Sequence, residues 1–123
     1  MKDAALLTLD LHMAGLKKNF LLKDASAYNV QFYRGKPIFI DHLSFDRCDR
    51  YPVWPAYGQF CRHFLSPLVL MAKVDPGLNQ LLRLHIDGIP LPLARKMVPT
   101  RRLLTFGLMI HFSSHARSQE KYA

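Results

Sequence analysis

The sequence predicts an α+β fold that is mainly α-helical and contains one β-hairpin. Apolar residues recur at helical spacing in several long stretches, and half of the residues are hydrophobic. Two β-prone runs, residues 30–33 and 37–40, flank Arg34-Gly35-Lys36, a glycine-containing turn of hairpin length. Because 123 residues suffice for one domain with a modest core, we expect a single domain over residues 1–123.

The first helix is expected over residues 2–18, with Asp3 as an acid in its first turn. His12 lies on or beside its apolar stripe, where a hydrogen-bonded core histidine is the preferred interpretation and a catalytic histidine the alternative. A wide apolar face predicts that this helix is well buried. The stripe consists of Leu6, Leu9, Met13 and Leu16, widened by Leu7, Leu11 and Ala14.

A second helical region is expected over residues 54–74, and Pro67 should kink or split it near Ser66. Cys61 and His63 resemble a nucleophile and a base, but side chains two positions apart on a helix do not face each other, so we reject this pair. The expected core stripe is Tyr57, Phe60, Phe64 and Leu68.

The other segments are shorter or more polar. A loop is expected over 20–29 and a polar, turn-rich connection over 42–53. Pro99 should end the helical turns before it. Further helices are expected at 78–86, with Leu78, Leu81, Leu82 and Ile86 inward, at 91–98, and at 103–112 with a continuation toward residue 122.

Metal and membrane signals are weak. His111 and His115 have metal-ligand spacing, yet no third ligand lies near them in the sequence. Cys48 and Cys61 are the only cysteines, and free thiols in a reducing compartment are the simplest interpretation. The longest nearly apolar run, residues 64–72, is too short to span a bilayer. These observations predict a cytoplasmic protein without a membrane span.

The formal net charge of +8 does not by itself predict a nucleic-acid partner. A nucleic-acid-binding surface needs clustered basic residues with stacking aromatic side chains, whereas the basic residues here are scattered. The charge suits an anionic substrate or an acidic neighbouring domain equally well.

Three polar residues frame the predicted hairpin: Asp24, Asn29 and Asp41. Paired antiparallel strands bring their outer ends together, so Asn29 and Asp41 should lie close, with Asp24 one loop away. The simplest interpretation is structural, with Asp24 and Asp41 capping turns and Asn29 beginning a strand.

The same residues resemble the catalytic loop of a protein-kinase-like C-terminal lobe, which carries Asp-x-x-x-x-Asn, a hairpin and a further Asp. The resemblance implies that Asp24 acts as a base and that Asn29 and Asp41 hold magnesium on a nucleotide. The chain departs from that pattern, because no His-Arg precedes Asp24 and His42-Leu43 follows Asp41 in place of Phe-Gly. The lobe that grips the nucleotide is absent too, so weak magnesium-nucleotide binding is the most to expect.

A second resemblance covers nearly the whole chain. The segments LKDASAYNVQF (22–32), IDHLSF (40–45), AYGQFCRHFLSPL (56–68) and DGIPL (87–91) resemble a region of nodulation-protein-like, class I S-adenosylmethionine-dependent methyltransferases. The resemblance implies that this region precedes a separate Rossmann-type domain carrying an acidic-Gly-x-Gly turn. Three residues depart from the pattern: His42, Pro55 and Gly58.

The glycines of this chain are isolated, so it lacks a turn through which a backbone could approach the methyl donor. We therefore expect no S-adenosylmethionine binding by the chain alone. Two hypotheses follow. The first is a non-catalytic upstream accessory or remnant domain, or a truncated reading frame, whose partner is a methyltransferase domain in cis or in trans. The second is a kinase-like phosphotransferase module that binds magnesium and a nucleotide.

Overall fold

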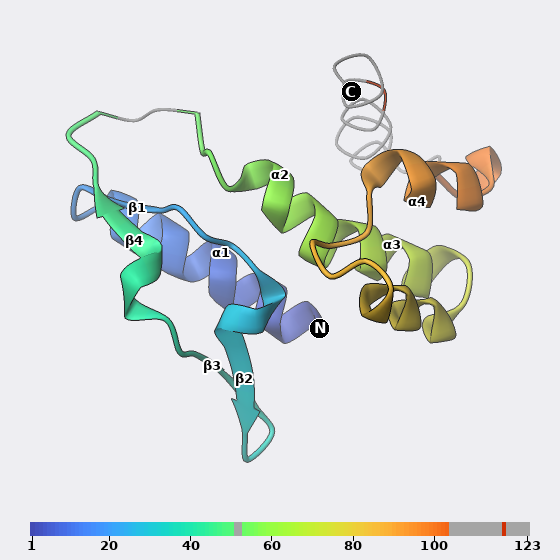
Figure 1. The fold of residues 1–123 in the computed structure, drawn as a ribbon, viewed down its shortest axis with the longest axis horizontal. Coiled ribbons are helices and arrows are strands. Elements are labelled where there is room, and N and C mark those ends of the chain that lie inside the picture. Colours follow the sequence, from blue (N-terminus) through green and yellow to red (C-terminus); the bar gives the residue numbers. More distant parts are fainter. Residues whose placement is uncertain (51–52, 104–116, 118–123) are drawn as a thin grey trace. The chain divides into compact units, whose positions relative to one another are not determined.

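The computed structural model has a mixed α+β fold that is mostly helical, with two small two-stranded sheets (Figure 1). It describes residues 1–50, 53–103 and 117. The chain divides into two units, Met1–Phe60 and Cys61–Ala123. Whether the two act as one domain stays a prediction. No helix of the described residues is long and apolar enough to cross a membrane.

Helix α1 spans Lys2–Leu16, slightly shorter than expected, and packs against strands β1 (Phe20–Leu22) and β3 (Lys36–Phe39). The expected buried face is present only in part, because Leu7, Leu9, Leu11 and Leu16 are half-buried. The fully buried residues are small or polar: Ala4, Ala5, Thr8 and His12. Leu6 and Met13 of the predicted stripe are 48% and 57% exposed. Small side chains let the helix lie close to the strands, and Thr8 satisfies its buried hydroxyl by donating to the carbonyl of Ala4 at 2.9 Å.

Strands β1 (Phe20–Leu22) and β4 (Phe45–Arg47) form an antiparallel sheet in which Leu22 lies opposite Phe45. The sequence-based expectation of loops over these residues was wrong. Three-residue strands carry little local signal, and here the pairing joins segments that are far apart in the sequence. At the end of α1, a Cβ on Gly15 would lie 3.1 Å from the carbonyl oxygen of Phe20, so a glycine allows helix and strand to approach.

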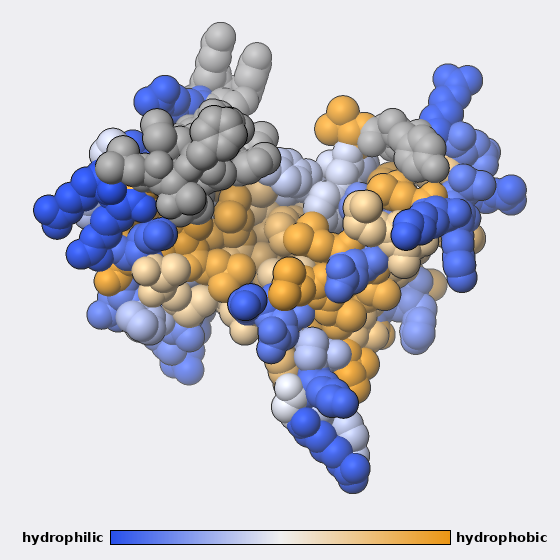
Figure 2. Space-filling model, turned by 180° about the vertical axis from the view of Figure 1, so that it is seen from behind, coloured by the Kyte–Doolittle hydropathy of each residue, from blue (hydrophilic) through white to orange (hydrophobic). Residues whose placement is uncertain are grey.

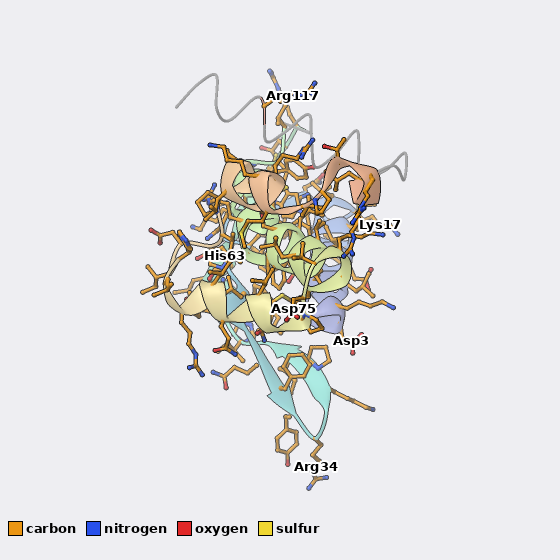
Figure 3. The ribbon with its side chains drawn as sticks, turned by 90° about the vertical axis from the view of Figure 1, so that its right-hand side faces the viewer. Asp3, Lys17, Arg34, His63, Asp75 and Arg117 are labelled. Atoms are coloured by element: carbon orange, nitrogen blue, oxygen red, sulfur yellow. The ribbon has the colours of Figure 1, made fainter. Side chains whose placement is uncertain are left out.

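The predicted hairpin is confirmed, formed by β2 (Val30–Tyr33) and β3 (Lys36–Phe39). Arg34 and Gly35 make its two-residue turn with φ of 49° and 76°, the geometry of a type I′ turn. Lys36 therefore belongs to a strand and not to the turn. Figure 3 shows Arg34 at the tip of the hairpin, and its guanidinium carbon lies 5.2 Å from the centre of the Tyr33 ring.

The predicted second helix is divided into three parts. Helix α2 (Tyr57–Phe60) belongs to the first unit, and a wide π-helical turn (Cys61–Leu65) and helix α3 (Ser66–Lys73) belong to the second. The change from the π-helical turn to α3 at Ser66 agrees with the position of Pro67, which lies in the first turn of α3. The wide turn rotates the following residues, so the buried set differs from the predicted stripe. Buried residues include Cys61, His63, Phe64, Ser66 and Leu70, whereas Tyr57, Phe60 and Leu68 are half-buried. Figure 3 labels His63 among the helices of the second unit.

The rest of the second unit consists of short helices. The expected short helix is present as a 3₁₀ helix, Pro76–Arg83, which begins where the Asp75 carboxylate accepts from the Gly77 amide at 2.7 Å. Ile86, expected to face inward, is 68% exposed. Helix α4 (Leu91–Met97) agrees with the expectation, and a 3₁₀ helix follows at Thr100–Leu103. The expected helix from residue 103 onward, with His111 and His115, lies outside the described residues apart from Leu103 and Arg117.

Gly88 lets the chain turn back against the wide turn of the preceding helix. Its φ is +89°, and a Cβ there would lie 2.7 Å from the carbonyl carbon of Arg62. The close approach allows the Ile89 amide to donate to the Arg62 carbonyl at 2.9 Å. Arg62 in turn donates from Nε to the Asp87 carbonyl at 3.2 Å. Both the backbone conformation and the lack of space therefore require glycine at this position.

We predict that Gly88→Ala lowers the free energy of unfolding by about 2–4 kcal/mol, through a left-handed backbone and a forced displacement of Arg62. Gly35→Ala is the matched control, because Gly35 also has a positive φ but has nothing within 4 Å of the added atom. It should cost only about 1–2 kcal/mol. Urea unfolding of both variants tests this, and equal losses would contradict the role of the close contact.

Candidate functional site

The three polar residues singled out in the sequence belong to the first unit. Asp24 follows strand β1, Asn29 ends a single 3₁₀ turn (Ala27–Asn29) before β2, and Asp41 precedes another 3₁₀ turn (His42–Ser44) after β3. The hairpin places Asn29 and Asp41 at its open end, where the Ile40 amide donates to the Asn29 carbonyl at 2.8 Å.

The Asp24 carboxylate holds its own loop against helix α2. Its Oδ1 accepts from the Ser26 amide at 3.0 Å and from Gln59 Nε2 at 2.9 Å. Gln59 uses its other amide atom as well, because Oε1 accepts from the Ala25 amide at 2.8 Å. One glutamine of α2 thus binds both a side chain and the backbone of the loop. Sequence reasoning missed Gln59, for which no local pattern gives a signal.

Asn29 and Asp41 are joined through Ser44. Asn29 Nδ2 donates to Ser44 Oγ at 3.1 Å and makes a longer bond, 3.4 Å, to the Asp24 carbonyl. Ser44 Oγ donates to Asp41 Oδ2 at 2.8 Å, and Asp41 Oδ1 accepts from the Leu43 amide at 3.0 Å. The expected proximity of the two hairpin ends is therefore present. Ser44, which is buried, was missed, although its spacing three residues after Asp41 is a known capping pattern.

Hydrogen bonds from Ser44 Oγ and the Leu43 amide lower the pKa of Asp41 below its usual value. Both donors favour the ionised carboxylate. Its own turn thus stabilises the charged form of Asp41.

The arrangement supports a structural network better than a magnesium site. The amide nitrogen of Asn29, which cannot bind a cation, is the atom that connects Asp24 to Ser44. Carboxylate oxygens of Asp24 and Asp41 already accept hydrogen bonds from the protein. Within residues 1–50, 53–103 and 117, no three His, Cys, Asp or Glu residues are grouped to hold a metal. The roles of Asp24 as a base and of Asn29 and Asp41 as ligands stay predictions.

His12 occupies the core of the first unit. It is 7% exposed, and its ring stacks on Trp54 with the ring centres 4.1 Å apart. Burial lowers its pKa below the usual value, since desolvation disfavours the imidazolium. The core position matches expectation, but among the residues that the structure describes Nδ1 has no hydrogen-bond partner. The expected full hydrogen bonding was therefore wrong, and stacking holds the ring in place.

Two hollows lie elsewhere. In the first unit, a groove of about 340 Å³ is lined almost wholly by apolar atoms of Leu11, Ala14, Gly15, Lys18, Phe20 and Phe45. In the second unit, a hollow of about 320 Å³ lies between Arg62 and residues 84–88 and 90. Neither is lined by Asp24, Asn29 or Asp41.

The chain is homologous to part of one curated protein, Nodulation protein NoeA of Rhizobium meliloti (strain 1021). The two are 37% identical over 119 residues, which cover 97% of this chain and 25% of the relative. The chain thus spans about a quarter of the relative's length. No family model matches the sequence, and no solved structure matches it. The resemblance to a nodulation protein is confirmed over this quarter, and assignment to a methyltransferase family goes beyond it.

If Asp24 has a structural role, Asp24→Asn should leave the free energy of unfolding nearly unchanged, because the amide keeps an acceptor oxygen for Ser26 and Gln59. Asp24→Ala should cost about 1–3 kcal/mol of unfolding free energy, since it leaves those donors unpaired in a partly buried site. Chemical denaturation compares the two. Equal and negligible losses would show that the network does not support the fold.

The lowered pKa of the buried His12 predicts that the folded protein loses stability in acid. Its pKa is lower in the folded than in the unfolded chain, so the unfolded chain binds a proton first. Stability should fall as pH drops below about 6.5, the unfolded value, until the folded pKa is reached. Trp54 is the single tryptophan, so its fluorescence reports the stacked pair. His12→Phe keeps a stacking ring and should abolish the effect in this range, whereas an unchanged pH profile would exclude His12 as the cause.

Proposed function

We propose that this chain is a non-catalytic accessory domain of a class I S-adenosylmethionine-dependent methyltransferase-type protein. In this proposal it works beside a separate methyltransferase domain, supplied in cis or in trans. The observation that carries the proposal is homology across almost the whole chain to only a quarter of a longer nodulation protein.

The hydrogen-bond network supports an accessory role. The polar residues that most resemble a catalytic motif, Asp24, Asn29 and Asp41, make hydrogen bonds within a shared network and to the backbone of their own loops. A catalytic base must reach a substrate proton, and a carboxylate held by neighbouring donors is positioned instead to brace a turn. The chain also offers no paired glycines in a strand-to-helix turn, which methyl-donor sites of the Rossmann type use.

The second candidate is a kinase-like phosphotransferase module, and one observation favours it. The chain brings Asn29 and Asp41 together through Ser44, with Asp24 adjacent to Asn29. Lys23, the nearest cation in sequence to Asp24, is bound to Asp46 at 2.9 Å and is not turned to a phosphate. This candidate requires that Asp24→Asn abolish ATP turnover, a loss that the accessory role does not produce.

The accessory proposal predicts that the chain alone shows no saturable binding of S-adenosylmethionine at micromolar concentration. It further predicts that the full-length Rhizobium meliloti relative binds this ligand, and that a hybrid in which this chain replaces the matched quarter binds it equally well. Isothermal titration of the three proteins is the measurement.

The possible failures are separable. Binding by the isolated chain would overturn the accessory role. No binding by the intact relative would remove the methyltransferase part of the proposal. A relative that binds while a folded hybrid does not would show that this chain cannot substitute for the homologous region.

A further inference from the structure

Helix α1 presents a stripe to the outside of the first unit. Leu6, Asp10, Met13 and Lys17 follow one another at intervals of four, three and four residues, so they lie along one helix face. All four are exposed. We call these four residues the outer stripe. Figure 2, seen from behind, shows hydrophobic side chains with interspersed charges on the side where α1 lies.

The outer stripe leaves two large apolar side chains, Leu6 and Met13, exposed among charged residues. The fully buried residues of α1 lie elsewhere on the helix, at Ala4, Ala5, Thr8 and His12. The other large apolar side chains of α1 are half-buried: Leu7, Leu9, Leu11 and Leu16. The apolar groove lined by Leu11, Ala14 and Phe20 runs alongside, and Phe20 is itself 45% exposed.

The charges of the outer stripe are self-complementary. Asp10 and Lys17 stand on either side of Met13, seven residues apart, too distant to pair within one helix. In two antiparallel copies with the twofold axis beside Met13, Asp10 of each copy lies opposite Lys17 of the other. The same register directs Leu6 to the end of the partner helix, where Phe20 is exposed.

We propose that the outer stripe of α1 is an interaction surface for a second copy of this chain, formed by antiparallel helix packing. Met13 packs at the axis, where a flexible thioether adapts to its own copy. Two Asp10–Lys17 pairs set the direction and register of the helices. Ala14, the exposed small residue next to Met13, leaves room for the helices to approach closely.

The interface is small, so the dimer is weak. Helix α1 is about 22 Å long. One helix pair covers less than the roughly 800 Å² per partner of a standard interface, so we expect a dissociation constant on the order of 10–1000 µM.

Sedimentation equilibrium of the full chain between about 10 µM and 1 mM tests the proposal, because this range spans the expected constant. Asp10→Lys and Lys17→Asp should each weaken dimerisation at least threefold by placing like charges opposite each other, and the double variant should restore it. Restoration cannot arise within one copy, because the two residues do not meet on the helix.

Met13→Glu should weaken dimerisation at least tenfold. The matched control is Leu84→Glu, which also charges an exposed residue, at 80% exposure, but in the second unit, and it should have no effect. Circular dichroism confirms that each variant is folded. A chain that stays monomeric at about 1 mM overturns the proposal, as does a dimer that neither the charge exchange nor Met13→Glu weakens.

Discussion

The indole of Trp54 connects three segments of the first unit that are far apart in the sequence. Its Nε1 donates to the carbonyl of Leu22 in β1 at 2.6 Å, and its ring stacks on His12 of α1. It also packs beside Phe60 of α2, with ring centres 5.6 Å apart. A large ring with one donor suits this position, because it fills space and satisfies a carbonyl at the edge of the core.

The small core of the first unit is built around this contact. Leu22, Ala25 and Ala56 form a buried cluster with Phe39, Phe45, Trp54 and Phe60 packed against it. Ala25 also receives the bond from Gln59, so the loop that carries Asp24 is fixed on both of its sides. The polar network and the apolar core thus meet at Ala25 and together hold the loop in place. This arrangement explains how the Asp24 loop is held against the rest of the first unit.

What the sequence predicts correctly depends on local geometry. The Arg34-Gly35 turn specifies the hairpin, and the hairpin alone brings Asn29 and Asp41 together. Pro67 marks the start of α3 in the same local way. The identity of the bridging atoms is not local, because Ser44 and Gln59 come from different elements. Spacing therefore predicted which residues of the candidate site lie close together. It did not predict that their polar atoms already make hydrogen bonds within the protein. The short strands β1 and β4 escaped prediction for the same reason.

The error about the buried face of α1 has a different cause, and it bears on the proposed contact with a second copy. Periodicity correctly finds apolar residues along a helix, but it does not say which of two apolar faces packs inside a given chain. Here the inward face uses Ala4, Ala5 and Thr8, because Gly15 and the strands approach closely, and larger side chains such as Leu6 and Met13 would not fit there. Full burial of one leucine or methionine side chain contributes about 1.5–3 kcal/mol. Much of that contribution is unrealised in the isolated unit, where Leu6 and Met13 are about half exposed. Leu6 and Met13, with Asp10 on one side of Met13 and Lys17 on the other, thus form the surface on which the proposed contact with a second copy would bury apolar area.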